Sequence, residues 1–215
     1  MKTPNTNTMK HLILVAGVIF SLATKMIAAE SAANDFTAID RSLGNFYGLI
    51  VNTHANVIIT QGERTSIRME GRKKDLDKID ASISNGSLVL NGTNTVAVTI
   101  YVTVAEINRV EVNSTARVFS SEVINSDVLL LKVNGNGSIR LDVRALSLGM
   151  LVKGTGKIVV SGTTGDSYAR VLGEGRINSA NLDAYSSRLE VNNGSVATVK
   201  EQDKSGRRLT LRMTN

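Results

Sequence analysis

Apolar and polar positions in the second half of the chain repeat with a period of about 20 residues. Each copy has a leading valine, a short turn of mostly small or polar residues, and then a β-branched residue. The leading valines are 21, 19, 19 and 20 residues apart. A fixed period of this length is typical of stacked repeats, because one repeat cannot bury its apolar face alone. The five copies are 112–118 (VNSTARV), 133–139 (VNGNGSI), 152–158 (VKGTGKI), 171–177 (VLGEGRI) and 191–196 (VNNGSV).

The remaining apolar residues predict short strands. From Phe36 to Leu90 they fall in short runs separated by Gly and Asn turns, which is typical of an all-β domain. Residues 72–79 (RKKDLDKI) are the one plausible helical turn, and 207–213 (RRLTLRM) alternates as a final strand. Strict alternation also predicts a half-buried strand over 96–104. Its expected inward residues are Val96, Val98, Ile100, Val102 and Val104.

A repeat of 19 residues has room for two or three short strands, and successive coils would stack about 4.8 Å apart. The period therefore favours a parallel β-helix over a propeller, whose blades need about 40 to 50 residues. Equal positions in successive coils should then form columns. We expect one buried column of Val112, Val133, Val152, Val171 and Val191, and a second of Val118, Ile139, Ile158, Ile177 and Val196.

The residue before each leading valine should point outward and so tests the register. These residues are Glu111, Lys132, Leu151, Arg170 and Glu190. Neighbouring coils would place Glu111 beside Lys132 and Arg170 beside Glu190, which are favourable cross-strand pairs. The charges therefore support parallel, in-register stacking.

The N-terminus has the pattern of a secretory signal. Lys2 and Lys10 precede an apolar run over 12–23, and small residues follow over 28–33. The alternative is a transmembrane anchor, but this run is shorter than the roughly 20 residues that span a bilayer. We expect a signal peptide over 1–33 and one exported domain over 34–215, with its repeat array at about 107–200.

Composition narrows the classes of function. The chain has no cysteine, which excludes disulfides, a thiol nucleophile and a cysteinyl metal site. Without residues 1–33 it keeps 22 basic and 18 acidic side chains, a mild excess, and it has no Trp. Nucleic-acid binders usually combine a basic stripe with aromatic stackers, so no nucleic-acid partner is expected. The Asn-x-Ser/Thr triplets at Asn85, Asn91, Asn113, Asn136 and Asn193 are interpreted as turns.

Several short motifs together resemble a bacterial family, the putative auto-transporter adhesin, head GIN domain. They are 46–48 (FYG), 56–62 (NVIITQG), 85–90 (NGSLVL), the alternating strand over 96–104, and the Gly-x-Gly copies at 135–137, 154–156 and 173–175. The resemblance implies an exported all-β protein, a single-stranded right-handed parallel β-helix (a solenoid of about 19 to 21 residues per coil) with an N-terminal β-rich cap. It departs from a true auto-transporter, because too few residues follow the repeats to form a membrane β-barrel.

No catalytic residues, cofactor or metal are predicted. The candidate acids Asp142, Asp166, Glu174 and Asp183 lie at different positions in their repeats, whereas general acid–base work needs paired carboxylates. His54 is the one histidine outside the signal segment and lies in a turn-like stretch. The Gly-x-Gly copies precede strands, so they do not match a dinucleotide fingerprint.

One candidate binding site remains. The residue after each turn reads Arg117, Ser138, Lys157, Arg176 and Ser195, and it should face solvent. Three cations, Arg117, Lys157 and Arg176, could hold an anionic glycan or a lipopolysaccharide phosphate. The alternative is surface charge that prevents aggregation.

The sequence thus favours an exported, non-enzymatic adhesin or envelope-interaction module of the bacterial periplasm or cell surface. A polysaccharide-active lyase or hydrolase, and a periplasmic structural or sensory module, are the alternatives.

Overall fold

A computed structural model describes residues 35–191, 196–202 and 208–214. The chain divides into two compact units, Met1–Thr37 and Ala38–Asn215. The predicted signal peptide lies outside the described residues. The second unit carries the repeats and almost all of the described strands.

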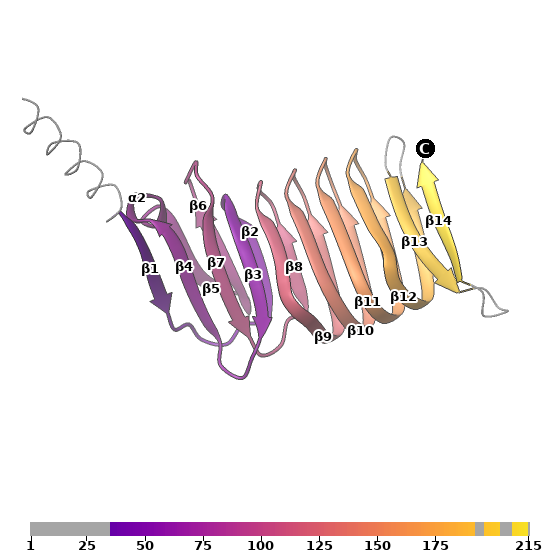
Figure 1. Cartoon of the computed structure of the whole chain (residues 1–215), viewed down its shortest axis with the longest axis horizontal. Helices are drawn as coiled ribbons and strands as arrows, with labels where there is room; N and C mark the ends of the chain where they lie inside the picture. Colours follow the sequence, from indigo (N-terminus) through magenta and orange to yellow (C-terminus); the bar gives the residue numbers. More distant parts are fainter. Residues whose placement is uncertain (1–34, 192–195, 203–207, 215) are drawn as a thin grey trace, which may run out of the picture. The chain divides into compact units, whose positions relative to one another are not determined.

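The described chain is all-β apart from one helical turn (Figure 1). Its first half holds β1 (Phe36–Arg41), β2 (Gly48–Asn52), β3 (Ala55–Gln61), β4 (Ser66–Arg72), α2 (Lys73–Leu76), β5 (Ile79–Ser84), β6 (Ser87–Gly92), β7 (Val98–Val104) and β8 (Arg109–Val112). Its second half holds β9 (Arg117–Val133), β10 (Ser138–Val152), β11 (Lys157–Val171), β12 (Arg176–Val191), β13 (Val196–Gln202) and β14 (Arg208–Thr214). The short helix and the final strand confirm the predictions from 72–79 and 207–213.

The predicted right-handed parallel β-helix is wrong. The strands form a curled, open sheet of mixed pairs, whose path from β4 runs β4-β7-β3-β9-β10-β11-β12-β13-β14. β4 pairs with β7, β5 with β6, and β13 with β14 in antiparallel fashion. The N-terminal strands are not a separate cap either, because β3 and β8 both pair with β9 in the same sheet.

Each of the three central repeats forms one long strand that bends, where several short strands were expected. In β10 the buried residues are odd-numbered from Ile139 to Ala145 and even-numbered from Leu148 to Val152. Because side chains alternate along a strand, this change of parity requires a bend between the two halves. The bend lies at Leu146, which is 68% exposed. Figure 1 shows these strands side by side, each curving at the end opposite the connecting turns.

The predicted stacking of like residues is confirmed, with one exception. The leading valines pair from Val112 through Val133, Val152 and Val171 to Val191. In the second column Val118, Ile139, Ile158 and Ile177 pair in turn. Val196 does not continue it, because the backbone of Val196 pairs with Arg176 and Ala197 pairs with Ile177. The register between β12 and β13 is therefore shifted by one residue relative to the earlier pairs.

The Gly-x-Gly turns are required by this stacking. A Cβ on Gly156 would lie 2.4 Å from Val133 Cγ1 and 2.7 Å from the Gly137 carbonyl oxygen, and Gly175 has the same relation to Val152 and Gly156. Side-chain atoms do not approach so closely, so these turns need glycine for packing. The motif therefore has a structural explanation.

The alternating segment over 96–104 is confirmed as β7 from Val98 onward. Val98, Ile100, Val102 and Val104 are buried, whereas Val96 precedes the strand and is 46% exposed. The turn reading of Asn85 is also supported, because Asn85 and Gly86 both adopt positive φ (49° and 70°).

Candidate functional site

The register of β9 to β12 brings the three predicted cations into one row. Arg117 pairs with Ser138, Ser138 with Lys157, and Lys157 with Arg176. The three cations are exposed, and each precedes a buried residue of the second column. Ser195, the fifth predicted position, lies outside the described residues.

Arg140 extends this row and was missed in the sequence. It lies two residues after Ser138, so its side chain projects from the same face of the sheet, and it is exposed. We call Arg117, Arg140, Lys157 and Arg176 the cation row. The sequence could have indicated Arg140, because the position two residues beyond Ser138, the serine of the predicted row, lies on the same face of the strand.

The cation row has no internal counterion. None of its four side chains makes an ion pair or a side-chain hydrogen bond with another residue in the described part of the chain. Lys157 and Arg176 are direct neighbours on adjacent strands. Like charges in directly opposed positions destabilise a sheet, so this arrangement costs the fold stability that an external anion would restore.

The unequal repeat lengths produce a groove beside the row. Between paired positions, β9 has Ser120, Ser121 and Glu122 where β10 has only Leu141. At the same level β12 has two residues, Ser179 and Ala180, where β11 has only Val160. The extra residues of the 21- and 20-residue repeats therefore form bulges on either side of the regular pair β10–β11. An open groove of about 980 Å³ lies there.

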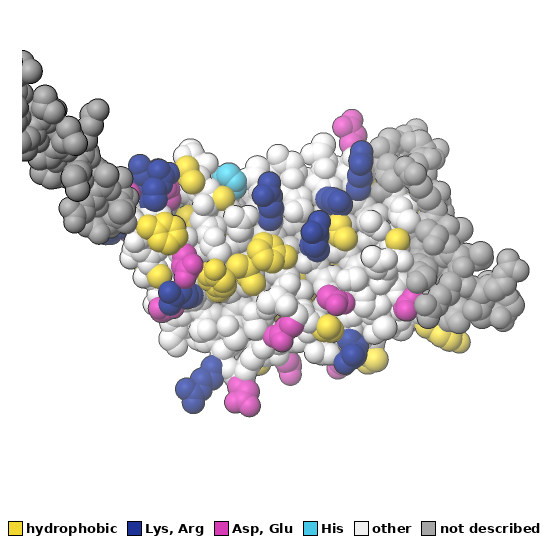
Figure 2. All heavy atoms as spheres, viewed as in Figure 1, with side chains coloured by type: hydrophobic (Ala, Val, Ile, Leu, Met, Phe, Trp, Pro, Cys, Tyr) yellow, Lys and Arg dark blue, Asp and Glu magenta, His cyan; other side chains and the backbone are white. Residues whose placement is uncertain are grey.

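The composition of the groove changes along the strands. Arg117 and Lys157 line one end, on either side of Ser138. In the middle, Phe119 (36% exposed) and half-buried Val159 lie on either side of Arg140. Val123, also 36% exposed, is level with Asp142. Glu122 and Asp142 line the other end, and the Ser120 hydroxyl accepts a hydrogen bond from the Asp142 backbone N–H (3.2 Å). Figure 2 shows this face, with dark blue side chains gathered over β9 to β12 beside a yellow band.

The candidate acids do not converge. Asp142 pairs with Ser161, Asp166 with Ser147, and Asp183 with Thr163, so they occupy three different columns. Glu174 lies in the turn between β11 and β12. His54 lies in a turn where its Nδ1 is 3.2 Å from the Thr95 carbonyl oxygen. The described residues contain no group of three or more acidic, His or Cys side chains placed to hold a metal.

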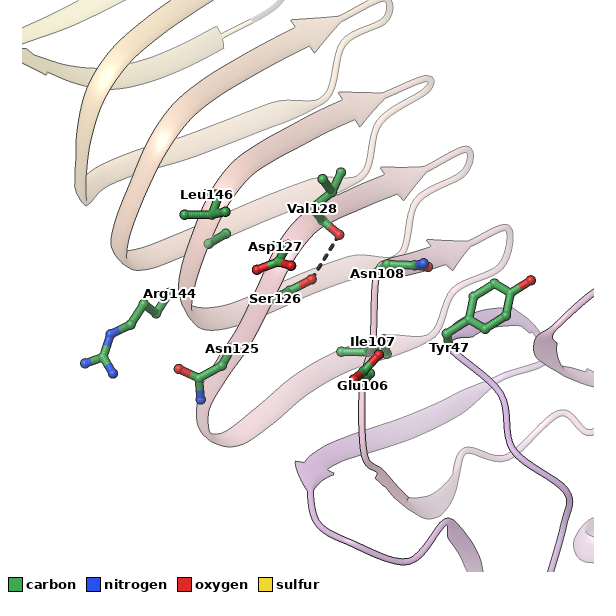
Figure 3. Close-up of a pocket in the computed structure, with 11 residues that line it drawn as sticks. Tyr47, Glu106, Ile107, Asn108, Asn125, Ser126, Asp127, Val128, Arg144 and Leu146 are labelled. Carbon is green, nitrogen blue, oxygen red and sulfur yellow. Dashed lines mark hydrogen bonds between the residues drawn. The ribbon is translucent and has the colours of Figure 1, made fainter.

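A second pocket, of about 600 Å³, lies at the bend of β9 and β10 (Figure 3). Its lining includes Tyr47, Glu106, Asp127, Arg144 and exposed Leu146. The Ser126 hydroxyl donates to the Val128 carbonyl oxygen (2.9 Å) and stabilises the bend. Figure 3 shows the Arg144 guanidinium turned away from Asp127, so these two opposite charges do not come together in the pocket.

The family model described as "Putative auto-transporter adhesin, head GIN domain" matches residues 45–208. The chain belongs to this family. The match spans both the cation row and the groove, and it confirms the resemblance found in the sequence motifs. A search of curated proteins found none that matches.

Solved structures share the fold of this head GIN domain chain at low sequence identity. A "putative lipid binding protein" from Parabacteroides distasonis has a TM-score of 0.60 and 12% identity, over 73% of this chain and 78% of that one. A "putative adhesin" from Bacteroides fragilis has a TM-score of 0.50 and 15% identity, over 77% and 96% of the two chains. Another from P. distasonis has a TM-score of 0.52 and 12% identity, over 73% and 81%. Within the described part of this chain, no helix is long and apolar enough to cross a membrane.

Proposed function

We propose that this protein is an exported, non-enzymatic binding module of the bacterial envelope, which holds anionic groups of a surface partner on its cation row. The observation that carries the proposal is the row itself, four exposed cations on adjacent strands without a counterion among the described residues. Membership of an adhesin family supports an exported or surface protein and a binding role.

The row suits carboxylate or phosphate groups that repeat along a partner. Arg117, Arg140 and Arg176 carry planar guanidinium groups, which bind such groups through two parallel hydrogen bonds. An anion placed between neighbouring cations would also remove the repulsion within the row. Since the row is exposed, salt should weaken the binding strongly. An anionic glycan and an anionic lipid head group both offer this chemistry.

Retention on polyanions tests the proposal. The purified chain is applied to immobilised polygalacturonate and to neutral dextran, and to vesicles of phosphatidylglycerol and of phosphatidylcholine. We expect retention on the anionic member of at least one pair, lost when the salt rises from about 50 mM to about 500 mM. Equal behaviour on the anionic and neutral members would contradict the proposal.

Charge-matched variants separate the cation row from the general basic excess. Arg117→Gln/Lys157→Gln/Arg176→Gln should lower the affinity for the retained anion about tenfold or more, because three charge-assisted contacts are removed. The control Arg64→Gln/Lys74→Gln/Lys78→Gln removes three exposed cations from the loop before β4, from α2 and from the turn after α2, and should keep most of the affinity. An equal loss in both variants would assign the binding to net charge alone. Assaying polygalacturonate for released oligosaccharides in the same samples tests the non-enzymatic part of the proposal.

A further inference from the structure

We infer that the groove between the two bulges binds the acyl chain of a single-chain anionic lipid, with its carboxylate or phosphate on the cation row. This inference rests on the proposed function and names the class of ligand for the same face. Its basis is one cavity of about 980 Å³ in which Arg117 and Lys157 lie at one end and the apolar side chains of Phe119 and Val159 flank Arg140 in the middle. That volume lies at the upper end of the usual range for small-ligand sites.

The apolar middle is unusual for an outward-facing sheet surface. Phe119 and Val159 both pair with Arg140 across the strands, at positions that normally carry polar side chains. The apolar band continues beyond the groove, because Phe119 pairs with Ile58 and Ile58 with Tyr101, which is 39% exposed. Exposing such side chains side by side costs free energy that a bound apolar chain would recover.

The order of groups along the strands sets the orientation of the ligand. Lys157 precedes Val159 by two residues and Ser161 by four, so the groove extends about 13 Å from the cation row at about 3.3 Å per residue. Glu122 and Asp142 line its far end. These carboxylates repel an anionic head group there, while Arg117 and Lys157 attract it at the near end and Arg140 attracts it from the middle. A polysaccharide would gain nothing from this polarity, because its charges repeat along its whole length.

Calorimetric titration with free ligands tests the inference. The probes are hexanoate, decanoate and dodecanoate, with the uncharged glycerol ester of dodecanoate as a comparison, all below their micelle concentrations. We expect affinity to rise from hexanoate to dodecanoate by at least tenfold, because each buried methylene contributes. Dodecanoate should also bind at least tenfold more tightly than its uncharged ester.

Variants of the groove residues test where the acyl chain binds. Phe119→Ser/Val159→Ser should lower dodecanoate affinity at least tenfold and leave polyanion retention in place, whereas Leu146→Ser/Val128→Ser, which alters two exposed apolar residues outside the groove, should change neither. If the double groove variant unfolds, Val159→Thr offers a substitution of nearly equal size, and we expect it to lower dodecanoate affinity two- to fivefold.

The outcomes separate this inference from the proposed function. Polyanion retention that depends on the cation row, together with no dependence on chain length, would overturn the acyl site and leave the proposed function standing. Capture of phosphatidylglycerol vesicles without binding of free dodecanoate would do the same, since head groups alone would explain it. Binding of neither polyanion nor dodecanoate would overturn both.

Discussion

Two charged rows cross the same four strands, β9 to β12, and they are built in opposite ways. In the row that precedes the leading valines, Lys132 lies 3.1 Å from Glu111 of β8, and Arg170 lies 3.3 Å from Glu190. We call this the paired row. In the cation row, Lys157 and Arg176 are neighbours with the same charge. Both rows share one backbone register, so they differ only in their partners. The cations of the paired row are neutralised by carboxylates of neighbouring strands. The cations of the cation row have no such carboxylate among the described residues.

Both rows lie over one buried core. Of the substitutions considered, one in that core should cause the largest loss of stability. Ile158 is fully buried and directly follows Lys157 of the cation row. Ile158→Ala should lower the free energy of unfolding by about 2 to 5 kcal/mol, because it leaves a cavity between stacked strands. Urea denaturation measures the loss. Its neighbour Lys157→Ala, on the outer face, should change stability by no more than about 0.5 kcal/mol; equal losses would show that the alternation of faces is misassigned.

Glu111 makes the paired row sensitive to pH. It is only 5% exposed, and burial alone would raise its pKa, but hydrogen bonds from Arg109 and Lys132 outweigh burial and lower the pKa below the ordinary value of 4.5. Asn134 donates a further bond to it (2.8 Å). A carboxylate with a depressed folded-state pKa stabilises the fold fully above its unfolded-state pKa, and loses that contribution as the pH falls through the folded-state value.

Glu111→Gln should therefore cost about 1 to 3 kcal/mol at neutral pH. The difference from the unaltered chain should shrink as the pH falls below about 4.5, the ordinary pKa. Chemical denaturation at a series of pH values measures both quantities. Exposed Glu63→Gln serves as the control. A cost of Glu111→Gln that stays constant down to the lowest pH would show that the charge of Glu111 does not stabilise the paired row.

The sequence was sufficient to predict the stacked columns up to Val196, the paired row and three of the four cations, because a side chain's position within a 19- to 21-residue period fixes its neighbours. It was insufficient for the direction of strand pairing. The alternation in β7 indicates a buried face, but nothing local states that β4 lies antiparallel to it. The bend of β10 follows from the switch of buried parity between Ala145 and Leu148, and an expectation of several short strands per repeat does not contain it.

The groove, too, could be predicted only in part. The repeat spacings of 21 and 20 residues exceed 19, and the sequence shows this directly. Their location could not be read from it, because the extra residues can be placed anywhere between two aligned valines. Only the pairing of Phe119 with Arg140 and of Val123 with Asp142 shows where β9 bulges. The apolar character of the groove therefore followed from the structure and not from the periodicity.

Making the paired row resemble the cation row should destabilise the fold. Glu190 is partly exposed, contacts Arg170 and Arg188, and accepts a hydrogen bond from the Tyr168 hydroxyl (2.9 Å). Glu190→Lys replaces attraction by repulsion across β11 and β12, and should cost about 0.5 to 1 kcal/mol at low salt. Thermal unfolding at two salt concentrations measures the loss, which salt should reduce. A stability unchanged by the substitution would mean that these exposed pairs do not help to hold the register.

Making the cation row resemble the paired row should have the smallest effect on stability and the opposite sign. Lys157→Glu places a carboxylate beside Arg176, its neighbour on β12, and directly opposite Ser138 on β10. This creates an attractive cross-strand pair where repulsion existed, so we expect a gain of about 0.2 to 1 kcal/mol in the free energy of unfolding. The same change should weaken retention on an anionic partner more than Lys157→Gln does, because it adds a repulsive charge at the centre of the row. Urea denaturation and salt-dependent retention on the same samples measure the two effects. If the cation row serves only solubility, Lys157→Glu should raise stability and leave binding unchanged. If the row binds a ligand, the same substitution should raise stability and weaken binding.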